Sequence, residues 1–501
     1  MNVYELISIG LYMLLMILIG LYSYRKSNNN SDEFLIGGRQ MGAAVTALSA
    51  GAADMSGWLL MGLPGAMYIS GLSASWIAIG LTIGAFLNYI LVAPRLRAYT
   101  EVASNSITIP VFFENRFRDK SRLLKITSSL LILIFFTLYT SSGMVAGGRL
   151  FESAFGMDYH MGLLTTSLVV VLYTFLGGFL AVSLTDFVQG AIMVLALVVL
   201  PIVLFTEIGG VSETFDIIEN KRSTYLQLFQ GTTTIGIISL LAWGLGYFGQ
   251  PHILVRFMAI DKISDLTKAR RIGITWMIFT VGGAMLVGLL GIAYLYKYDQ
   301  ATMAQFDGSK AYAETIFIHL SRVLFHPLIG GFLLSAILAA VMSTISSQLL
   351  VTSSSLTEDI YREFINKEAS PKRLLLISRL SVLIVAVIAY VLSIVPKDSI
   401  LNLVGNAWAG FGAAFGPVIL LSLLWKKSTK WGALAGMLVG AITVLAWVYV
   451  PHNYKDVYEM IPGFTLAIVT NVIVSLMTYK LDTEIMEEFA EVERLIKDKT
   501  R

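Results

Sequence analysis

Oxygen-bearing side chains inside long apolar segments are the residues of this sequence that could do chemistry. Asp54 lies near the middle of the apolar stretch 42–70, where a carboxylate is costly unless a partner or a function compensates. In another stretch, Ala340, Ser343 and Thr344 are spaced i, i+3 and i+4 and share one helical face. Two hydroxyls beside a backbone carbonyl suit a hard monovalent cation. Such hydroxyls can instead bond back to the carbonyl one turn earlier, and this alternative stays open.

Two apolar segments are interrupted by helix-breaking residues. The stretch 42–70 is poor in helix formers around Asp54, at Gly51, Ser56, Gly57, Gly62, Pro64 and Gly65. The stretch 232–252 is interrupted by Gly244, Gly246, Gly249 and Pro251. Free N–H groups of a broken membrane helix suit a carboxylate, and free carbonyls suit a cation. The small residues could also serve close helix packing, which does not explain Asp54. These two segments are therefore candidate binding segments.

The sequence lacks the residues that other kinds of chemistry require. The chain has no cysteine and only five scattered histidines, so thiolate nucleophiles and disulfides are excluded and metal-ligand spacing is absent. No phosphate loop or dinucleotide fingerprint occurs in it. We expect no enzyme, and the net charge of +3 says nothing about nucleic acid.

The composition indicates a membrane protein. Of the 501 residues, 56% are hydrophobic and 14% are charged, against about 25% charged in soluble domains. Apolar runs long enough to cross a bilayer, which takes about 20 helical residues, predict an all-α polytopic protein. Thirteen candidate spans lie near 4–24, 42–70, 74–96, 126–155, 160–182, 187–209, 232–252, 272–296, 327–357, 374–396, 398–425, 431–450 and 458–479.

Basic residues predict the orientation of these spans. With the N-terminus outside, the five longer inside segments carry 22 Lys and Arg and the outside segments carry seven, as expected when basic loops face the cytoplasm. The inside segments are 25–41, 95–125, 253–271, 358–373 and 426–430. An odd number of spans then places the C-terminus inside. The tail 481–501 reads as an amphipathic helix, either solvated or docked.

The two broken spans open two matching sets of five. Because five is odd, the sets have opposite orientations, and interrupted helices at matching positions of inverted halves point to a transporter's binding site. We expect a single membrane domain over 1–480. It comprises an extra span at 4–24, inverted repeats at 42–209 and 232–425, and two extra spans at 431–479.

Four segments resemble the sodium:solute symporters. They are ADMSGW (53–58), GGFLAVSLTDFVQG (177–190), WGLGYFGQPHILVRFMA (243–259) and ILAAVMSTISSQLLVTSSSLTEDIY (337–361). The likeness extends from about residue 3 to 480. It implies a LeuT-type core of two inverted five-helix repeats within 13 transmembrane helices, with the N-terminus out and the C-terminus in.

The resemblance also implies site residues. A sodium site would use the carbonyls of Ala52, Met55 and Ala340 with the hydroxyls of Ser343 and Thr344. Asp54 matches an aspartate needed for sodium coupling, by orienting the broken helix or by ligation. Asp186 matches a second aspartate on the sodium exit route, although it could simply cap the sixth helix. Substrate would contact Ser56, Gly57, Trp58, Tyr139, Trp243, Tyr247, Phe248 and Pro251.

The implied function is secondary transport. The resemblance implies sodium-coupled symport of L-proline. The chemistry is reasonable, because an apolar aromatic wall suits a small ring and the free donors and acceptors of broken helices suit a zwitterion. Another small solute, such as a different amino acid, a monocarboxylate or a sugar, remains an alternative, as does proton coupling through Asp54. Sodium is co-transported, the bilayer and the solute are the partners, and neither nucleic acid nor an obligate protein partner is indicated. The expected location is the inner membrane of a bacterium.

Overall fold

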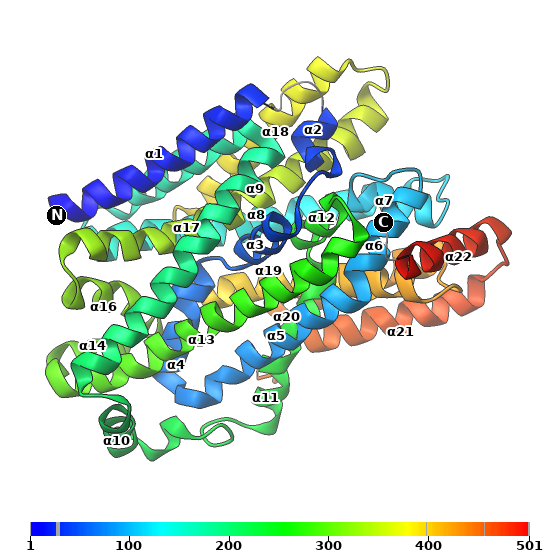
Figure 1. Ribbon diagram of the computed structural model, residues 1–501. Helices are drawn as coiled ribbons and strands as arrows, with labels where there is room; N and C mark the ends of the chain where they lie inside the picture. The colour runs from blue at the N-terminus through cyan, green and yellow to red at the C-terminus, as the bar shows by residue number, and fades with distance from the viewer. Residues whose placement is uncertain (1, 27–30, 397, 455, 499–501) are drawn as a thin grey trace.

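The protein is a bundle of long, roughly parallel helices (Figure 1). The computed structural model describes residues 2–26, 31–396, 398–454 and 456–498, so the last three residues of the predicted tail lie outside it. Helices dominate, and within the described residues the β-structure is confined to one isolated bridge between Met41 and Ile260. The all-α architecture is confirmed.

The order of α-helices along the chain follows the predicted apolar runs. They are α1 (Val3–Lys26), α2 (Ser31–Ile36), α3 (Ala43–Asp54), α4 (Leu63–Ser70), α5 (Trp76–Leu87), α6 (Ala93–Val102), α7 (Ile109–Arg116), α8 (Leu123–Phe155), α9 (Tyr159–Ile208), α10 (Val211–Lys221), α11 (Thr234–Leu241), α12 (Pro251–Ala259), α13 (Leu266–Tyr298), α14 (Gln300–Gly308), α15 (Lys310–Ala313), α16 (Ile316–Leu324), α17 (Pro327–Ser354), α18 (Pro371–Ser393), α19 (Ile400–Leu424), α20 (Lys430–Tyr449), α21 (Met460–Thr478) and α22 (Thr483–Lys497).

Several of these helices join into longer stretches. A π-helical segment, Trp58–Gly62, leads into α4, and another, Asn88–Val92, joins α5 to α6. A 3₁₀ segment, Ala242–Gly249, lies between α11 and α12. Ten stretches of the described residues are long and apolar enough to cross a membrane. The count of thirteen spans and the orientation of the termini stay predictions.

Gly178 divides α9 into two segments. Its φ of 56° and ψ of −146° lie in a region that only glycine adopts readily. A Cβ there would lie 2.5 Å from Cδ2 of Phe34. The chain therefore turns at Gly178 and not at 183–186, where the gap between two predicted spans was expected. That prediction was wrong because the run stays apolar through the turn.

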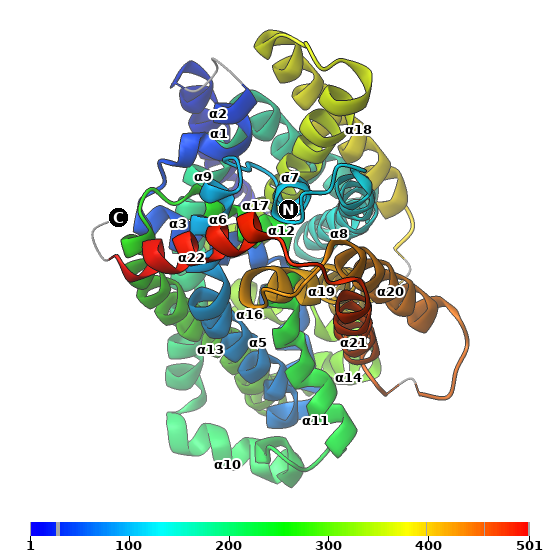
Figure 2. The same ribbon diagram turned by 90° about the vertical axis from the view of Figure 1, so that its right-hand side faces the viewer.

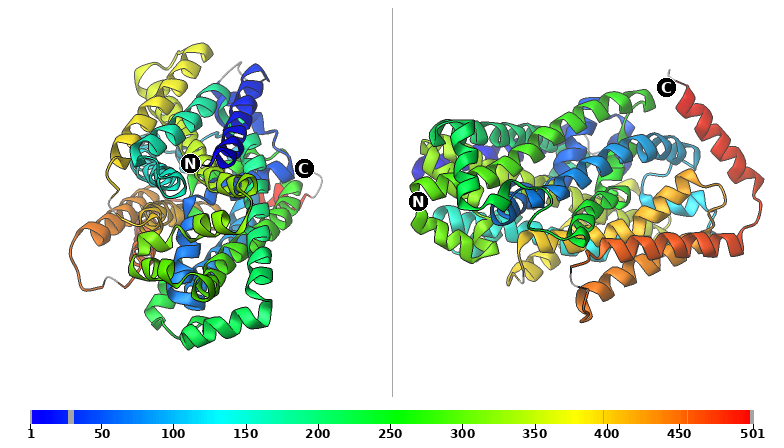
Figure 3. Two further views of the ribbon diagram at one scale, coloured as in Figure 1. Left: turned by 90° about the vertical axis from the view of Figure 1, so that its left-hand side faces the viewer. Right: turned by 90° about the horizontal axis from the view of Figure 1, so that it is seen from below.

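The two ends of the bundle carry different short helices. The N-terminus of α1 lies at the end that also holds α10, α14 and α16, and α7 and α22 lie at the opposite end (Figures 1 and 3). At the first end, the Glu314 carboxylate accepts hydrogen bonds from the N–H groups of Ile400 and Leu401, both at 3.0 Å. It also pairs with Arg149 at 3.3 Å. Burial raises the pKa of Glu314, and these partners oppose the shift. A carboxylate at the start of α19 complements the helix dipole.

The C-terminal helix α22 crosses the end of the bundle (Figure 2). Its apolar face is buried through Phe489, Val492 and Leu495. The Phe489 ring lies 5.4 Å from that of Tyr99 and 4.7 Å from the guanidinium carbon of Arg116. Of the two readings of the tail, the docked one therefore holds.

Arg116 is not the simple topology signal that its place in a basic loop suggests. Its side chain is fully buried, and its Nε donates to the Ser422 carbonyl at 2.8 Å. Arg118 is ion-paired to Glu484 and, at 3.0 Å, to Glu488. Burial raises the pKa of Glu488, and Arg118 opposes that shift. These contacts tie α22 to the loop that follows α7 and to α19.

Replacing Phe489 with alanine should release α22 from the bundle. Burial of a phenylalanine side chain contributes about 1.5–3 kcal/mol, so docking should weaken roughly ten- to a hundredfold. Limited trypsin digestion, which cleaves after the exposed Arg494, should then proceed faster in Phe489→Ala. The matched control, Glu487→Ala on the exposed face of the same helix, should digest like the parent. Equal rates for all three proteins would contradict the docking.

Candidate functional site

The break at the end of α3 frees two backbone carbonyls. In a continuous helix, the N–H of Ser56 would bond to the Ala52 carbonyl, but it bonds to that of Asp54 at 2.9 Å. Likewise, the N–H of Leu59 bonds to the Ser56 carbonyl at 3.0 Å and not to that of Met55. The carbonyls of Ala52 and Met55, both predicted sodium ligands, are therefore released from the helical ladder.

The hydroxyl face of α17 lies against this break. Ser343 Oγ is 2.7 Å from the Ala52 carbonyl oxygen and 3.1 Å from that of Ala340. Thr344 Oγ1 donates to the same Ala340 oxygen at 3.1 Å. The back-bonding alternative is thus realised in part, yet Ser343 also reaches across to α3. Four of the five predicted sodium ligands meet in one oxygen cluster that joins α3 to α17.

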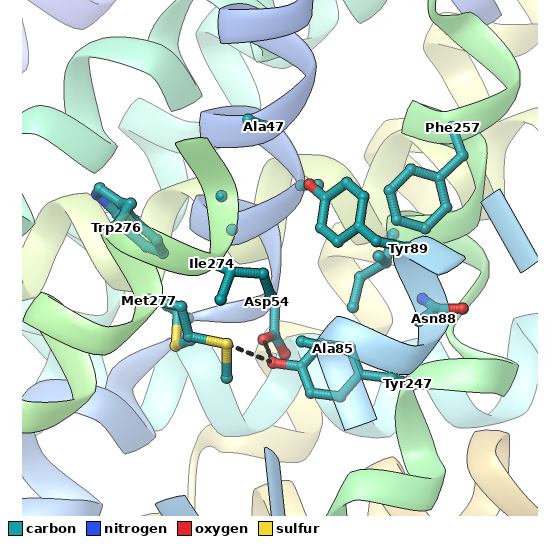
Figure 4. Close-up of a pocket in the computed structure, with 15 residues that line it drawn as sticks. Ala47, Asp54, Ala85, Asn88, Tyr89, Tyr247, Phe257, Ile274, Trp276 and Met277 are labelled. Carbon is teal, nitrogen blue, oxygen red and sulfur yellow. Dashed lines mark hydrogen bonds between the residues drawn. The ribbon is translucent and has the colours of Figure 1, made fainter. Parts of the chain in front are cut away.

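The Asp54 side chain makes a different contact. It accepts a hydrogen bond from the Tyr247 hydroxyl, and both side chains are buried. The Asp54 carbonyl also accepts from the Trp58 indole at 3.2 Å. Asp54 and Tyr247 line a cavity of about 30 Å³ that Trp276 and Met277 also border (Figure 4). This volume admits water but not an amino acid.

Asp186 belongs to a fully buried ion pair. Its Oδ2 is 3.2 Å from Nη2 of Arg256, and both side chains are 0% exposed. Ser49 donates to Asp186 at 2.7 Å, Arg256 Nε donates to Ser49 Oγ at 3.1 Å, and Nη2 lies 2.5 Å from Ser347 Oγ. The cluster joins α3, α9, α12 and α17 one helical turn from Ser343. Asp186 lies inside α9, so the capping interpretation is wrong.

Arg256 also corrects the predicted end of the seventh span. The sequence placed it in an inside loop at 253–271, but α12 continues to Ala259 and every residue of α12 is buried. A charge normally ends an apolar run. Here the charge is neutralised by Asp186, which is 70 residues away in the sequence.

The candidate substrate residues of α8 and the first break lie close together and are buried. Ser56 and Tyr139 are each 1% exposed, and their hydroxyls interact with each other but have no other hydrogen-bond partner among the described residues. A Cβ on Gly57 would lie 2.7 Å from that of Ala146 in α8, so glycine allows close packing as well as the break. A hydroxyl has one donor and two acceptor sites, so this pair keeps hydrogen-bonding capacity that a ligand or water can use.

The remaining substrate candidates line the second break. The Trp243 ring stacks on Tyr458 at 5.2 Å, so its face is turned to the segment before α21. Phe248 packs near Gly416 of α19. Pro251 begins α12, with Gln250 between it and the 3₁₀ segment, and at the first helical position its missing N–H costs nothing. The structure therefore groups Trp58 and Tyr247 around Asp54 but places Trp243 against Tyr458 and Phe248 against α19.

Three polar or aromatic residues near the second break were missed from the sequence. Trp408 donates to the Trp243 carbonyl at 2.8 Å and accepts from Gln250 Nε2 at 3.1 Å through its own carbonyl. Gln250 Oε1 and both ring nitrogens of His252 are buried without a partner among the described residues. The polar pair flanking Pro251 in an apolar segment was the available signal for Gln250 and His252. Trp408 offered none.

Comparison with known proteins agrees with this arrangement. The sodium:solute symporter family matches residues 34–440 of the chain. Similar curated proteins include the osmoregulated proline transporter OpuE of Bacillus subtilis, 59% identical over 100% of both chains. The chain therefore belongs to the sodium:solute symporter family.

Two further relatives and two solved structures extend the comparison. The high-affinity proline transporter PutP of Bacillus subtilis is 56% identical over 95% of this chain and 98% of its own. A sodium/proline symporter of Staphylococcus aureus is 52% identical over 98% and 96%. A Na⁺-coupled sialic acid symporter in a substrate-bound outward-open state superposes with a TM-score of 0.80 at 19% identity, covering 96% and 99%. The nucleobase-cation-symport-1 transporter Mhp1 superposes at 0.53 and 13%, covering 93% and 99%. The last two establish the fold alone.

Proposed function

We propose that the chain is a sodium-coupled symporter that carries L-proline into the cell. The observation that carries the proposal is the oxygen cluster between the break of α3 and the hydroxyl face of α17, with Ser343 Oγ 2.7 Å from the Ala52 carbonyl. A cation there would replace the amide protons that the break removes from Ala52 and Met55. Relatives of 52–59% identity are named as proline transporters or sodium/proline symporters, which supports proline as the solute.

The fold suggests how the two cargoes are coupled. We assign residues 42–209 and 232–425 to two inverted repeats, with 1–480 as one membrane domain and 481–501 as the tail inside the cell. Sodium entering from outside joins α3 to α17 and stabilises the state that binds proline. One charge crossing 100 mV supplies about 2.3 kcal/mol before the concentration gradient is added. Each ligand must raise the affinity of the other by the same factor.

The buried groups near the breaks suit a zwitterion. The hydroxyls of Ser56 and Tyr139 have no partner but each other among the described residues, and the aromatic rings of Trp58 and Tyr247 supply an apolar wall around a small ring. Because the side chains of this region are buried, proline can enter and leave only if the helices move. Alternating access in the inner membrane of a bacterium accounts for that closure.

Uptake into proteoliposomes tests the proposal. Purified protein should accumulate labelled L-proline under an inward sodium gradient and not under proton or potassium gradients of equal size. Unlabelled proline should compete, whereas other amino acids, monocarboxylates and sugars should not. Accumulation driven by protons alone, or competition by a different solute with proline inactive, would overturn it.

Replacing Ser343 or Thr344 with alanine should raise the sodium concentration needed for half-maximal uptake. Each change removes one oxygen from the cluster, and a hydrogen-bond-strength contact to a charge contributes about 1.5–3 kcal/mol, so the shift should be at least about tenfold. Sodium titration of initial uptake rates measures it. Ser354→Ala on the same helix should titrate like the parent, because its hydroxyl bonds to the Val351 carbonyl and not to the oxygen cluster. An unchanged sodium dependence in Ser343→Ala would exclude the assigned site.

A further inference from the structure

We propose that Tyr247 is a positioning residue. Through its hydrogen bond to Asp54, it transmits the presence or absence of sodium at the cluster between α3 and α17 to the residues that form the wall of the substrate pocket. The inference rests on the proposed function, because it concerns how the two cargoes influence each other. It gives Asp54 a role that needs no contact with the ion. The link is built from three consecutive contacts.

The first contact fixes the end of α3 at the sodium cluster. Ser343 Oγ is 2.7 Å from the Ala52 carbonyl, which lies two residues before Asp54 on the last turn of α3. Ala52 and Met55 precede and follow Asp54 in the sequence. A cation bound to their released carbonyls therefore fixes the backbone on both sides of Asp54. The backbone of Asp54 is further held by the Trp58 indole at 3.2 Å. Sodium binding therefore sets where the Asp54 carboxylate points.

The second contact joins the two broken helices. One carboxylate oxygen of Asp54, the last residue of α3, accepts the hydroxyl of Tyr247, which lies in the 3₁₀ segment between α11 and α12. Asp54 is 2% exposed and Tyr247 is 4% exposed, so the bond is shielded from bulk water. In the close-up, the Tyr247 ring points directly at the Asp54 carboxylate (Figure 4).

The third contact joins Tyr247 to the neighbouring helix, α19. Its ring meets that of Trp408 edge-on, with centroids 5.2 Å apart at 83°. Trp408 in α19 donates to the Trp243 carbonyl and accepts from Gln250, so it is bonded to the backbone before Tyr247 and to a side chain after it. A shift of Asp54 therefore moves the wall made by the second break. Removing the Tyr247 hydroxyl should break this series of contacts at one atom and leave the packing of the ring intact.

Equilibrium binding of labelled L-proline to the purified full-length protein tests this link. The quantity measured is the ratio of the proline Kd without sodium to the Kd at saturating sodium. Allosteric coupling between two sites is commonly about 5- to 150-fold, and Tyr247→Phe should reduce the ratio by about tenfold. The Kd without sodium should change less, because the aromatic ring remains. Tyr89→Phe is the matched control, since Tyr89 borders the same cavity and its hydroxyl has no partner among the described residues.

A double variant separates the link from a local packing effect. Asp54→Ala should lower the ratio, and adding Tyr247→Phe should lower it no further, because both changes cut the same bond. Additive losses, or a parental ratio in Tyr247→Phe, would overturn the inference. If the parent itself showed no sodium effect on proline binding, the proposed function would fail first and the inference with it. Direct binding of the substrate ammonium by Asp54 would appear as a loss of proline affinity without sodium and an unchanged ratio in Tyr247→Phe.

A second measurement does not depend on proline. The chain has no cysteine, so a single Leu245→Cys places one reporter thiol in the 3₁₀ segment beside Tyr247. Sodium should change its rate of maleimide labelling, and Tyr247→Phe in the same background should abolish that change. The link would be contradicted if sodium left the labelling rate of Leu245→Cys unchanged. It would also be contradicted if sodium changed that rate equally with and without Tyr247→Phe. Size-exclusion elution of each variant reports whether it is folded.

Discussion

Replacing Asp54 with alanine should abolish sodium-driven proline uptake while leaving the amount of inserted protein unchanged. The change removes the acceptor of the buried Tyr247 hydroxyl and the carboxylate that joins the two broken helices. Loss of a buried hydrogen bond to a charged group costs about 1.5–3 kcal/mol, so the uptake rate should fall by about a hundredfold at the upper end. Initial uptake rates in membrane vesicles, normalised to immunoblotted protein, measure the effect.

The control for this prediction is another carboxylate of the same protein. Glu152 is exposed near the end of α8, and Glu152→Ala should transport at the parental rate. Sodium-driven uptake by Asp54→Ala at a rate close to that of the parent would show that the carboxylate is not required. The same variant measured with excess sodium distinguishes a weakened sodium site, which excess sodium rescues, from a severed link between the broken helices, which it does not.

Breaking the ion pair between Asp186 and Arg256 should have the largest effect on stability. Both side chains are fully buried, and removal of one partner of such a pair typically costs about 3–5 kcal/mol because the other charge is left uncompensated. Asp186→Asn and Arg256→Gln should therefore each lower the thermal unfolding temperature of the detergent-purified protein. The loss arises in the centre of the bundle, where α3, α9, α12 and α17 meet.

The double variant decides whether the charge is responsible. Asp186→Asn combined with Arg256→Gln leaves no unpaired charge, so it should recover part of the stability lost by either single change. As a matched control, Arg494→Gln removes one partner of the exposed pair with Glu491, and it should have no measurable effect. If the losses of the two single changes simply added, the two charges would be acting independently.

Local sequence signals predicted those parts of the candidate site that depend on neighbouring residues of the chain. The glycines and polar residues around Gly57 indicated a break, and the break does release the carbonyls of Ala52 and Met55. The i, i+3, i+4 spacing placed Ser343 and Thr344 on one face of α17, which turns toward α3. Such features depend on backbone chemistry within one or two turns, which a single sequence carries.

Contacts between distant segments could not be predicted in the same way. Arg256 reads as a loop charge until Asp186 is placed beside it, and Arg116 reads likewise until α22 and the Ser422 carbonyl surround it. Periodicity describes which face of a helix is apolar but not which partner covers that face. The bond between Asp54 and Tyr247 spans 193 positions, so neither residue signals the other.

The break after Asp54 makes the end of α3 depend on the bound ion in the proposed transport cycle. A helix normally completes its last turn with its own amide protons, but here two peptide oxygens lack them. In the proposed mechanism, the ion stands in for those protons, so the last turn of α3 has its full set of partners only while sodium is bound. The ion is then a removable piece of secondary structure. Its departure on the cytoplasmic side would loosen the segment that holds the solute, and release of one cargo would lower the barrier to release of the other.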